Sequence, residues 1–345
     1  MLLAEKLYRN RSLTVSEYKN LLDNRTEECT CYLTEKADEV RREIYGNRVF
    51  LRGLIEISNI CKNDCYYCGI RASNSACRRY RLIPEEIISC CKEGYRLGFR
   101  TFVLQGGEDA FFSDGVLCDI IKKIKTLFPE CAVTLSLGER SRESYAELYK
   151  AGADRYLLRH EASNESLYKK LHPDKMSLSN RINCLQELKE IGFQTGCGFM
   201  VGAPYQTNGH IAEDLKFIEE FKPDMCGIGP FVPHKDTKFK SYPSGSAELT
   251  CYLLSIIRLI HPNVLLPATT ALGTVDPAGR EKGILAGANV VMPNLSPESV
   301  RGKYDLYDNK VSFGAESAAN RKELEERLKK IGFEAVTSRG DIIKP

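Results

Sequence analysis

The sequence contains no tryptophan and only five histidines in 345 residues. None of the histidines has metal-ligand spacing, so the sequence gives no signal for a histidine-bound metal. Long hydrophobic runs are also absent, because Ser255 and Arg258 interrupt the longest candidate, residues 251–260. We therefore expect no membrane-spanning segment. The N-terminus reaches charge after four residues, which does not match the apolar part of a signal peptide.

The sequence has almost no excess of charge of either sign. The chain has 49 Lys and Arg against 46 Asp and Glu, which leaves a net charge of +3. A dedicated nucleic-acid binder usually shows a clear basic excess. With 43% hydrophobic and 28% charged residues, the composition is typical of a soluble globular protein. We expect a cytoplasmic protein with no nucleic-acid partner and no membrane partner.

Cysteine is plentiful, with fourteen residues, yet none follows Cys251. Without an export signal, a disulfide framework is disfavoured and a metal or redox use gains weight. Most cysteines lie in helix-like or strand-like contexts, where a small buried hydrophobic residue is the default interpretation. Three are clustered, at Cys61, Cys65 and Cys68.

The hydrophobic pattern predicts a helical start and then alternation. Residues 1–48 are predicted to be helical, and from Phe50 short apolar strands alternate with amphipathic helices. Eight such strands over about 240 residues predict a (β/α)8 barrel of the TIM type, with a doubly wound open sheet as the competing fold. We expect an N-terminal helical extension (1–48), the barrel (49–305) and a C-terminal helix with a polar tail (306–345). The predicted strands are 51–57, 101–105, 132–137, 155–159, 195–201, 225–229, 264–267 and 289–292, and the last predicted helix is 318–331.

The three clustered cysteines have the spacing Cys61-x3-Cys65-x2-Cys68, directly after the first barrel strand. Catalytic groups of such barrels lie at the carboxyl ends of the strands. A 4Fe–4S cluster normally takes four cysteines, so three would leave one iron open for a small molecule. Two alternatives remain: a zinc site completed by Cys77, and three cysteines with only structural roles.

This loop resembles that of the radical S-adenosylmethionine (SAM) superfamily. The resemblance rests on Cys61-Lys-Asn-Asp-Cys-Tyr-Tyr-Cys68, with Tyr67 before the third cysteine, and on Gln105-Gly-Gly-Glu-Asp109 after the next strand. It implies one 4Fe–4S cluster whose open iron chelates SAM. It further implies that an electron from the cluster cleaves SAM to methionine and a 5′-deoxyadenosyl radical, which attacks the substrate.

Further stretches resemble one family within this superfamily, the HydE family of FeFe-hydrogenase maturation enzymes. That resemblance implies a small organometallic or cysteine-derived substrate in the barrel lumen, namely a cysteine-bound iron carbonyl cyanide precursor. It also implies a reductant protein and the other hydrogenase maturases as partners. The matching stretches are 78–80, 84–87, 104–109, 133–139, 153–161, 180–184, 227–234, 267–271 and 288–294.

The residues also predict a polar lumen. Thr134 and Ser136 are two apart on a strand and therefore share a face, as Arg159 and Glu161 do against His160. Such a lumen suits a polar or anionic ligand, although Arg159 and Glu161 could instead form a structural ion pair. By resemblance, the SAM site contains Tyr67, Gln105, Gly106, Gly107, Glu108, Ser136, Glu161 and Arg181. By resemblance, the substrate cavity contains Thr134, Arg159, Thr269, Thr270, Met292, Tyr304 and Tyr307, of which Met292 and the tyrosines could equally be core residues.

The sequence departs from the family pattern at two places. Some HydE proteins carry a second cysteine cluster near the end of the barrel, which this chain cannot supply after Cys251, so we expect one cluster only. Gly106 replaces a serine of the family pattern. The alternatives are a biotin synthase-like sulfur insertion, a methylornithine-forming mutase, and a non-catalytic zinc or iron–sulfur scaffold. For sulfur insertion, only Cys197 and Cys226 could serve as lumen ligands, and we expect both to be core residues.

Overall fold

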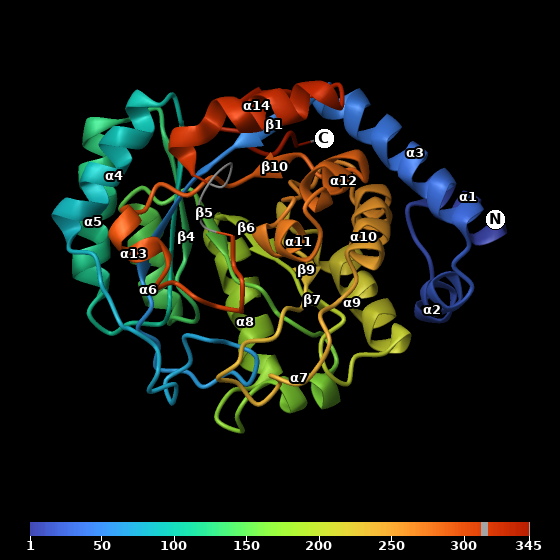
Figure 1. Ribbon diagram of the computed structural model, residues 1–345, viewed down its shortest axis with the longest axis horizontal. Coiled ribbons are helices and arrows are strands. Elements are labelled where there is room, and N and C mark those ends of the chain that lie inside the picture. The colour runs from blue at the N-terminus through green and yellow to red at the C-terminus, as the bar shows by residue number, and fades with distance from the viewer. Residues whose placement is uncertain (312–316, 345) are drawn as a thin grey trace.

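A computed structural model describes residues 1–311 and 317–344, and Figure 1 shows a ring of helices around the strands. The chain begins with α1 (Leu2–Asn10), α2 (Val15–Asp23) and α3 (Glu27–Tyr45). A capping box begins α2, since Thr14 Oγ1 accepts from the Glu17 amide and the Glu17 carboxylate accepts from the Thr14 amide. The helical start of the chain follows from these local signals.

Six strands form a parallel sheet whose order follows the chain. Its register pairs Glu56 with Gln105 and Gln105 with Ser136, so that these polar side chains share one face of the sheet. Leu135 and Leu137 lie on the other face, within the hydrophobic core. The strands are β2 (Gly53–Ser58), β3 (Thr101–Gly106), β4 (Ala132–Ser136), β5 (Arg155–Leu157), β6 (Gln194–Cys197) and β8 (Met225–Cys226).

Single bridges close this sheet into a barrel. Leu265 pairs with Met225 of β8, and Pro267 pairs with Val290 of β10 (Val290–Val291). β10 in turn pairs with β1 (Arg48–Leu51), which continues into β2. The doubly wound alternative is therefore wrong. The predicted strand at 264–267 forms bridges only, and the predicted strands at 195–201 and 225–229 are each interrupted. Their second halves, β7 (Met200–Val201) and β9 (Gly229–Pro230), pair with each other.

Helices cover the outside of the barrel. Cys197 and Cys226 are register partners on β6 and β8, fully buried in the core between sheet and helices. None of the helices in the described part of the chain combines the length and apolarity that a bilayer crossing requires. The helices after α3 are α4 (Pro84–Arg96), α5 (Asp114–Leu127), α6 (Arg142–Lys150), α7 (Glu165–Leu171), α8 (Leu178–Ile191), α9 (Asn208–Phe221), α10 (Ala247–Ile260), α11 (Thr270–Val275), α12 (Gly279–Leu285), α13 (Glu298–Arg301), the short 3-10 helix η2 (Ala318–Asn320) and α14 (Arg321–Lys330).

The last described residues form the floor of the barrel, where the sequence predicts only a polar tail. β11 (Glu334–Val336) pairs with β1, and the chain then crosses beneath the strands. The fully buried Arg155 donates to Asp341 at 2.6 Å, and Arg52 donates to the carbonyl of Gly340 at 3.2 Å. In Figure 1 this end of the chain and α14 lie on the side opposite α7. The amino ends of the strands are thus closed, and the opposite ends carry the cysteine loop.

Candidate active site at the cysteine loop

The cysteine loop follows β2 and rests against the end of β3. A side chain at Gly107 would place its Cβ 2.8 Å from Cys61 Cβ and 2.3 Å from the Ile60 carbonyl oxygen. Only glycine therefore lets the two segments approach this closely. This contact explains why a glycine, Gly107, follows the end of β3 next to the loop.

The three thiols of this loop suit metal ligation. The sulfur of Cys61 accepts two backbone hydrogen bonds, from the amides of Asn63 and Glu108, each at 3.4 Å. Burial raises the pKa of Cys61 and Cys68, and it raises that of Cys65 to about 12. Buried thiolates at such positions need a bound cation, and hydrogen bonds to sulfur are characteristic of iron–sulfur sites.

The spacing of the thiols favours a cluster over a single ion. Two sulfurs that both bind one zinc at about 2.3 Å can be no more than about 4.6 Å apart. In the described chain, no three of the cysteine sulfurs lie within 4.8 Å of one another. Cys77, the proposed fourth zinc ligand, instead faces Asn59, whose Nδ2 lies 3.6 Å from its sulfur. The zinc alternative thus has no geometric support.

A second group, His234 with Asp305 and Asp308, does have single-ion spacing. The amide of Asp236 donates to His234 Nδ1 at 3.1 Å, so the ring proton lies on Nε2, which faces Asp305 at 3.6 Å. This arrangement leaves no lone pair on Nε2 for a metal. The group instead ties the loop after β9 to the segment that contains Tyr304.

Tyr67 is held by a buried histidine. His172 Nδ1 donates to the carbonyl of Tyr168 at 2.9 Å, so Nε2 accepts from the Tyr67 hydroxyl at 3.1 Å. The His172 ring also stacks on Tyr168, with ring centres 4.0 Å apart. Burial lowers the pKa of His172 to about 3, so the ring is neutral near pH 7. Sequence reasoning missed His172, because a lone histidine carries no spacing signal.

Because His172 is buried in its neutral form, we expect the folded protein to lose stability in acid. The unfolded chain binds a proton at His172 below about pH 6.5, whereas the folded chain does not until about pH 3. The unfolded state therefore binds more protons in this window, and the free energy of unfolding falls as the pH drops. Between pH 7 and pH 5 this histidine contributes a loss of about 2 kcal/mol. Urea denaturation of His172→Gln should show a pH dependence smaller by that amount. Identical slopes for variant and wild type would contradict this account.

Arg181 lies in a chain of polar groups beside the loop. It is only 8% exposed, which excludes a solvated helix position, and it pairs with Glu139 at 2.6 Å. The amide of Glu139 donates to the Glu108 carboxylate at 3.1 Å, and that carboxylate pairs with Lys62 at 3.0 Å. Sequence reasoning did not assign Glu139 to the site, because Glu139 lies in the loop after β4 and its partner Arg181 lies on α8.

Arg159 and Glu161 form an ion pair at 3.1 Å. Glu161 adopts a positive φ of 65°, which a side chain such as glutamate rarely takes, and so turns the chain at the end of β5. His160 lies on the opposite side, fully buried beside Asp214 at 3.2 Å. Arg159 and Glu161 thus lie on one face and His160 on the other, as the sequence predicts. The negative charge of Glu161 is also close enough to the Cys65 thiol to add to the rise in its pKa that burial causes.

The predicted substrate residues divide between the floor and the wall of the lumen. Thr134 and Met292 line a cavity of about 20 Å³ together with Arg52, which is room for about one water molecule. Among the described residues, the buried hydroxyl oxygens of Thr134 and Thr269 have no hydrogen-bond partner. Tyr304 is buried next to Gln105. Thr270 begins α11, and Tyr307 is partly buried on the segment after Tyr304.

Glu56 and Lys310 add an ion pair to this wall that the sequence did not indicate. Lys310 Nζ lies 2.5 Å from the fully buried Glu56 carboxylate and also donates to the carbonyl of Tyr304. Asn294 donates to the other carboxylate oxygen at 2.9 Å. This network holds the Tyr304 segment across the lumen.

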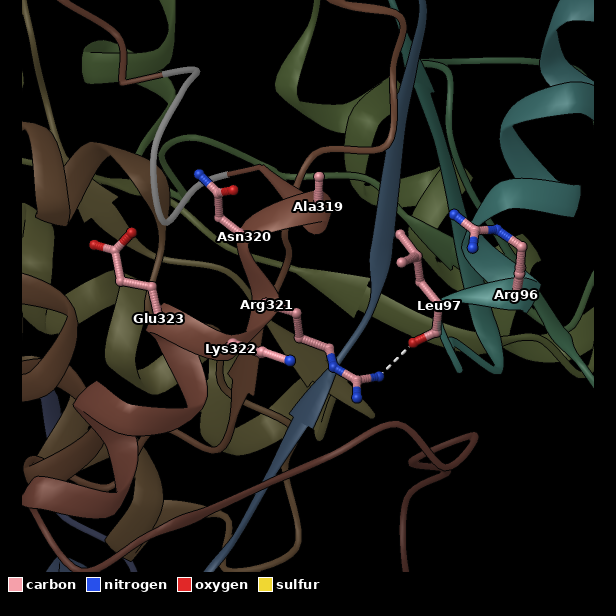
Figure 2. A pocket seen from close by; sticks show the side chains of 7 residues that line it. All are labelled: Arg96, Leu97, Ala319, Asn320, Arg321, Lys322 and Glu323. Carbon is pink, nitrogen blue, oxygen red and sulfur yellow. Dashed lines mark hydrogen bonds between the residues drawn. The ribbon is translucent and has the colours of Figure 1, made fainter.

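A surface depression lies away from these residues. It measures about 580 Å³ and sits on the outside of the barrel, between the end of α4 and the start of α14. Figure 2 shows Arg321 reaching across it to the carbonyl of Leu97. None of the predicted site residues lines this depression.

Comparison with known sequences shows the family to which this barrel belongs. The signature of the Radical SAM superfamily matches residues 55–218. The chain is 47% identical over 279 residues to the [FeFe] hydrogenase maturase subunit HydE of Thermotoga maritima, covering 81% of this chain and 79% of that protein. It is 28% identical over 332 residues to a 3-methylornithine synthase of Methanosarcina acetivorans, covering 96% and 92%.

Solved structures agree with this assignment. Methylornithine synthase PylB superposes with a TM-score of 0.84 at 26% identity, over 97% of both chains. The maturase HydG superposes with a TM-score of 0.80 at 23% identity, over 97% of this chain and 75% of that one, which bears on the fold alone.

Proposed function

This chain is a radical SAM enzyme that belongs to the HydE family of [FeFe]-hydrogenase maturases, and we propose that it cleaves SAM reductively at the cysteine loop to act on a precursor of the hydrogenase active site. The observation that carries the proposal is the loop itself. Three partly buried thiols, two backbone amides aimed at the first sulfur and a glycine-lined strand end converge there.

Cys61, Cys65 and Cys68 would hold a single 4Fe–4S cluster. When bound, the cluster supplies the electron that cleaves SAM to methionine and a 5′-deoxyadenosyl radical. The amides of Asn63 and Glu108 stabilise a thiolate at Cys61 through their hydrogen bonds.

The residues proposed to bind SAM surround this loop. Tyr67 is fixed by neutral His172, so its ring is oriented before any ligand binds. Gln105 and Ser136 are register partners facing the lumen. Arg181 and Glu139 provide paired charges suited to the carboxylate and ammonium of the methionine part. Gly106, Gly107, Glu108 and Glu161 complete the set.

We place the substrate in the lumen, between the loop and the closed floor. The unpaired hydroxyls of Thr134 and Thr269 are donors for acceptor atoms of a buried ligand, and Arg159 offers a cation. These donors suit a carboxylate or cyanide-bearing compound such as a cysteine-bound iron carbonyl cyanide. Thr270, Met292, Tyr304 and Tyr307 complete the proposed lining.

The test is anaerobic reconstitution with iron and sulfide. We expect about four irons per chain and 5′-deoxyadenosine formation from SAM with dithionite as the reductant. The maturase assignment is tested by adding the enzyme to a hydrogenase maturation mixture that lacks its HydE component. If the enzyme contains a full iron–sulfur cluster and still forms no 5′-deoxyadenosine, the proposal is overturned.

Arg181→Lys tests the SAM site. Lysine keeps the charge but loses the guanidinium fork, and a charged hydrogen bond contributes about 1.5–3 kcal/mol. We expect the KM for SAM to rise by about tenfold or more, with kcat nearly unchanged. Steady-state 5′-deoxyadenosine kinetics measure this. An unchanged KM would remove Arg181 from the SAM site.

A methylornithine-forming mutase is the second candidate, because the superposition with methylornithine synthase spans 97% of both chains. Detection of 3-methylornithine in an anaerobic assay would favour it. Biotin synthase-like sulfur insertion loses its basis, since Cys197 and Cys226 are core residues, as the sequence predicts, packed between sheet and helices.

A further inference from the structure

Positive charge is concentrated around the cysteine loop. The loop segment 61–81 carries five Lys or Arg and one Asp, and the segments 169–175 and 235–240 each carry three Lys and one Asp. Their total of eleven basic and three acidic residues gives a net of +8, whereas the whole chain carries +3, which leaves −5 on the remainder. The near-neutral composition therefore conceals a strong local asymmetry.

The three segments form one surface. Lys175 donates to the carbonyl of Lys62 at 3.1 Å, which joins the second segment to the loop. The ammonium of Lys238 lies 3.4 Å from the ring centre of Tyr66, next to Cys65, which joins the third segment. The guanidinium of Arg71 donates to the carbonyl of Asp236 at 3.0 Å. These contacts make a continuous basic rim around the cysteines.

The cations of this rim face solvent, whereas its acidic groups are few. Asp64 is engaged by Arg71 and Ser73, and Asp236 is only partly exposed. Asp174 is the one fully exposed acidic residue in the three described segments. The exposed cations are Lys62, Arg78, Arg81, Lys169, Lys170, Lys175, Lys235, Lys238 and Lys240.

We infer that this basic rim is the docking surface for an acidic one-electron carrier protein. The inference rests on the proposed function, because reductive cleavage of SAM needs one electron that no group of the chain itself supplies. The carrier is oxidised by one electron and the cysteine-bound cluster is reduced by one. A positive rim attracts and orients an acidic partner with its redox centre facing the loop, and −5 on the remainder disfavours other approaches.

The test measures binding of an acidic plant-type 2Fe–2S ferredoxin to the reconstituted enzyme by titration calorimetry. Lys175, Lys238 and Lys240 are changed together to Glu. The matched control changes Lys122, Lys123 and Lys150 to Glu, which are exposed on α5 and α6 and give the same change in net charge. At low salt we expect the rim variant to bind at least tenfold more weakly than wild type and the control to stay within about threefold.

Activity separates this inference from the proposed function. With dithionite, which needs no docking, both variants should form 5′-deoxyadenosine at the wild-type rate, whereas with reduced ferredoxin only the rim variant should be slowed, by about tenfold. Wild-type affinity that does not fall with salt, or a rim variant that binds like the control, would overturn the docking surface. Failure of the wild type with dithionite would instead overturn the proposed function, while the binding comparison would still decide the docking surface.

Discussion

A variant with Cys61, Cys65 and Cys68 all changed to Ala is expected to bind no iron–sulfur cluster and to form no 5′-deoxyadenosine. The reason is that these three thiols are the only ligands the loop offers, since Cys77 points toward Asn59. We expect a loss of at least about a thousandfold, limited by the assay background. Iron content, the visible absorption of the reconstituted protein and product formation from SAM with dithionite measure it.

Cys77→Ala is the matched control. It removes a thiol from the same loop segment, yet we expect wild-type iron content and activity. Circular dichroism should show that the triple variant keeps its fold. The three loop thiols are only partly buried and are not among the fully buried residues of the barrel core. Product formation by the triple variant would refute the mechanism, and iron loss in Cys77→Ala would revive the zinc-like four-thiol site.

Ending the chain at Thr337 is expected to destabilise the barrel strongly. The truncation removes the Asp341 carboxylate and the Arg339 carbonyl, which accept hydrogen bonds from buried Arg155, and the Gly340 carbonyl, which accepts one from Arg52. Removing one partner of a buried pair costs about 3–5 kcal/mol. We expect Tm to fall by roughly 10 °C or more. Thermal unfolding followed by circular dichroism measures it.

Asp341→Asn separates charge from coverage in this experiment. It keeps the tail on the floor but removes the charge opposite Arg155, so we expect an intermediate loss of about 2 kcal/mol. The side chain of Asp341 is 38% exposed, and solvent therefore screens part of its interaction. A truncated protein as stable as the wild type would show that the tail only lies on the surface.

Local patterns were sufficient to predict the barrel and its cysteine loop. Alternating apolar segments determine the order of strands and helices, and the lumen face follows from a two-residue period, as Thr134 and Ser136 illustrate. The loop was found because Cys61, Cys65 and Cys68 are close in sequence. Signals of this kind are contained within a few residues and need no knowledge of distant partners.

What the sequence could not indicate depends on contacts between distant segments. Glu139 gains its role from Arg181 on α8, and Glu56 pairs with Lys310, more than two hundred residues away. Residues 264–267 look like a strand yet form only single bridges, to Met225 on one side and to Val290 on the other. The sequence predicts no more than a polar tail at this end of the chain, because the partners of the tail, Arg52 and Arg155, lie far away in the sequence, inside the barrel.

The position of β1 has a consequence for the order of folding. Its two neighbours, β10 and β11, begin at residues 290 and 334, whereas β2 to β5 each pair with the strand that follows in the chain. Contacts over such sequence separations form late, because the entropy of closing the loop must first be overcome. The half-barrel with the cysteine loop can thus be in place while the ring is still open. Refolding should then proceed in two kinetic phases, and iron could reach the thiols before the final seam has formed.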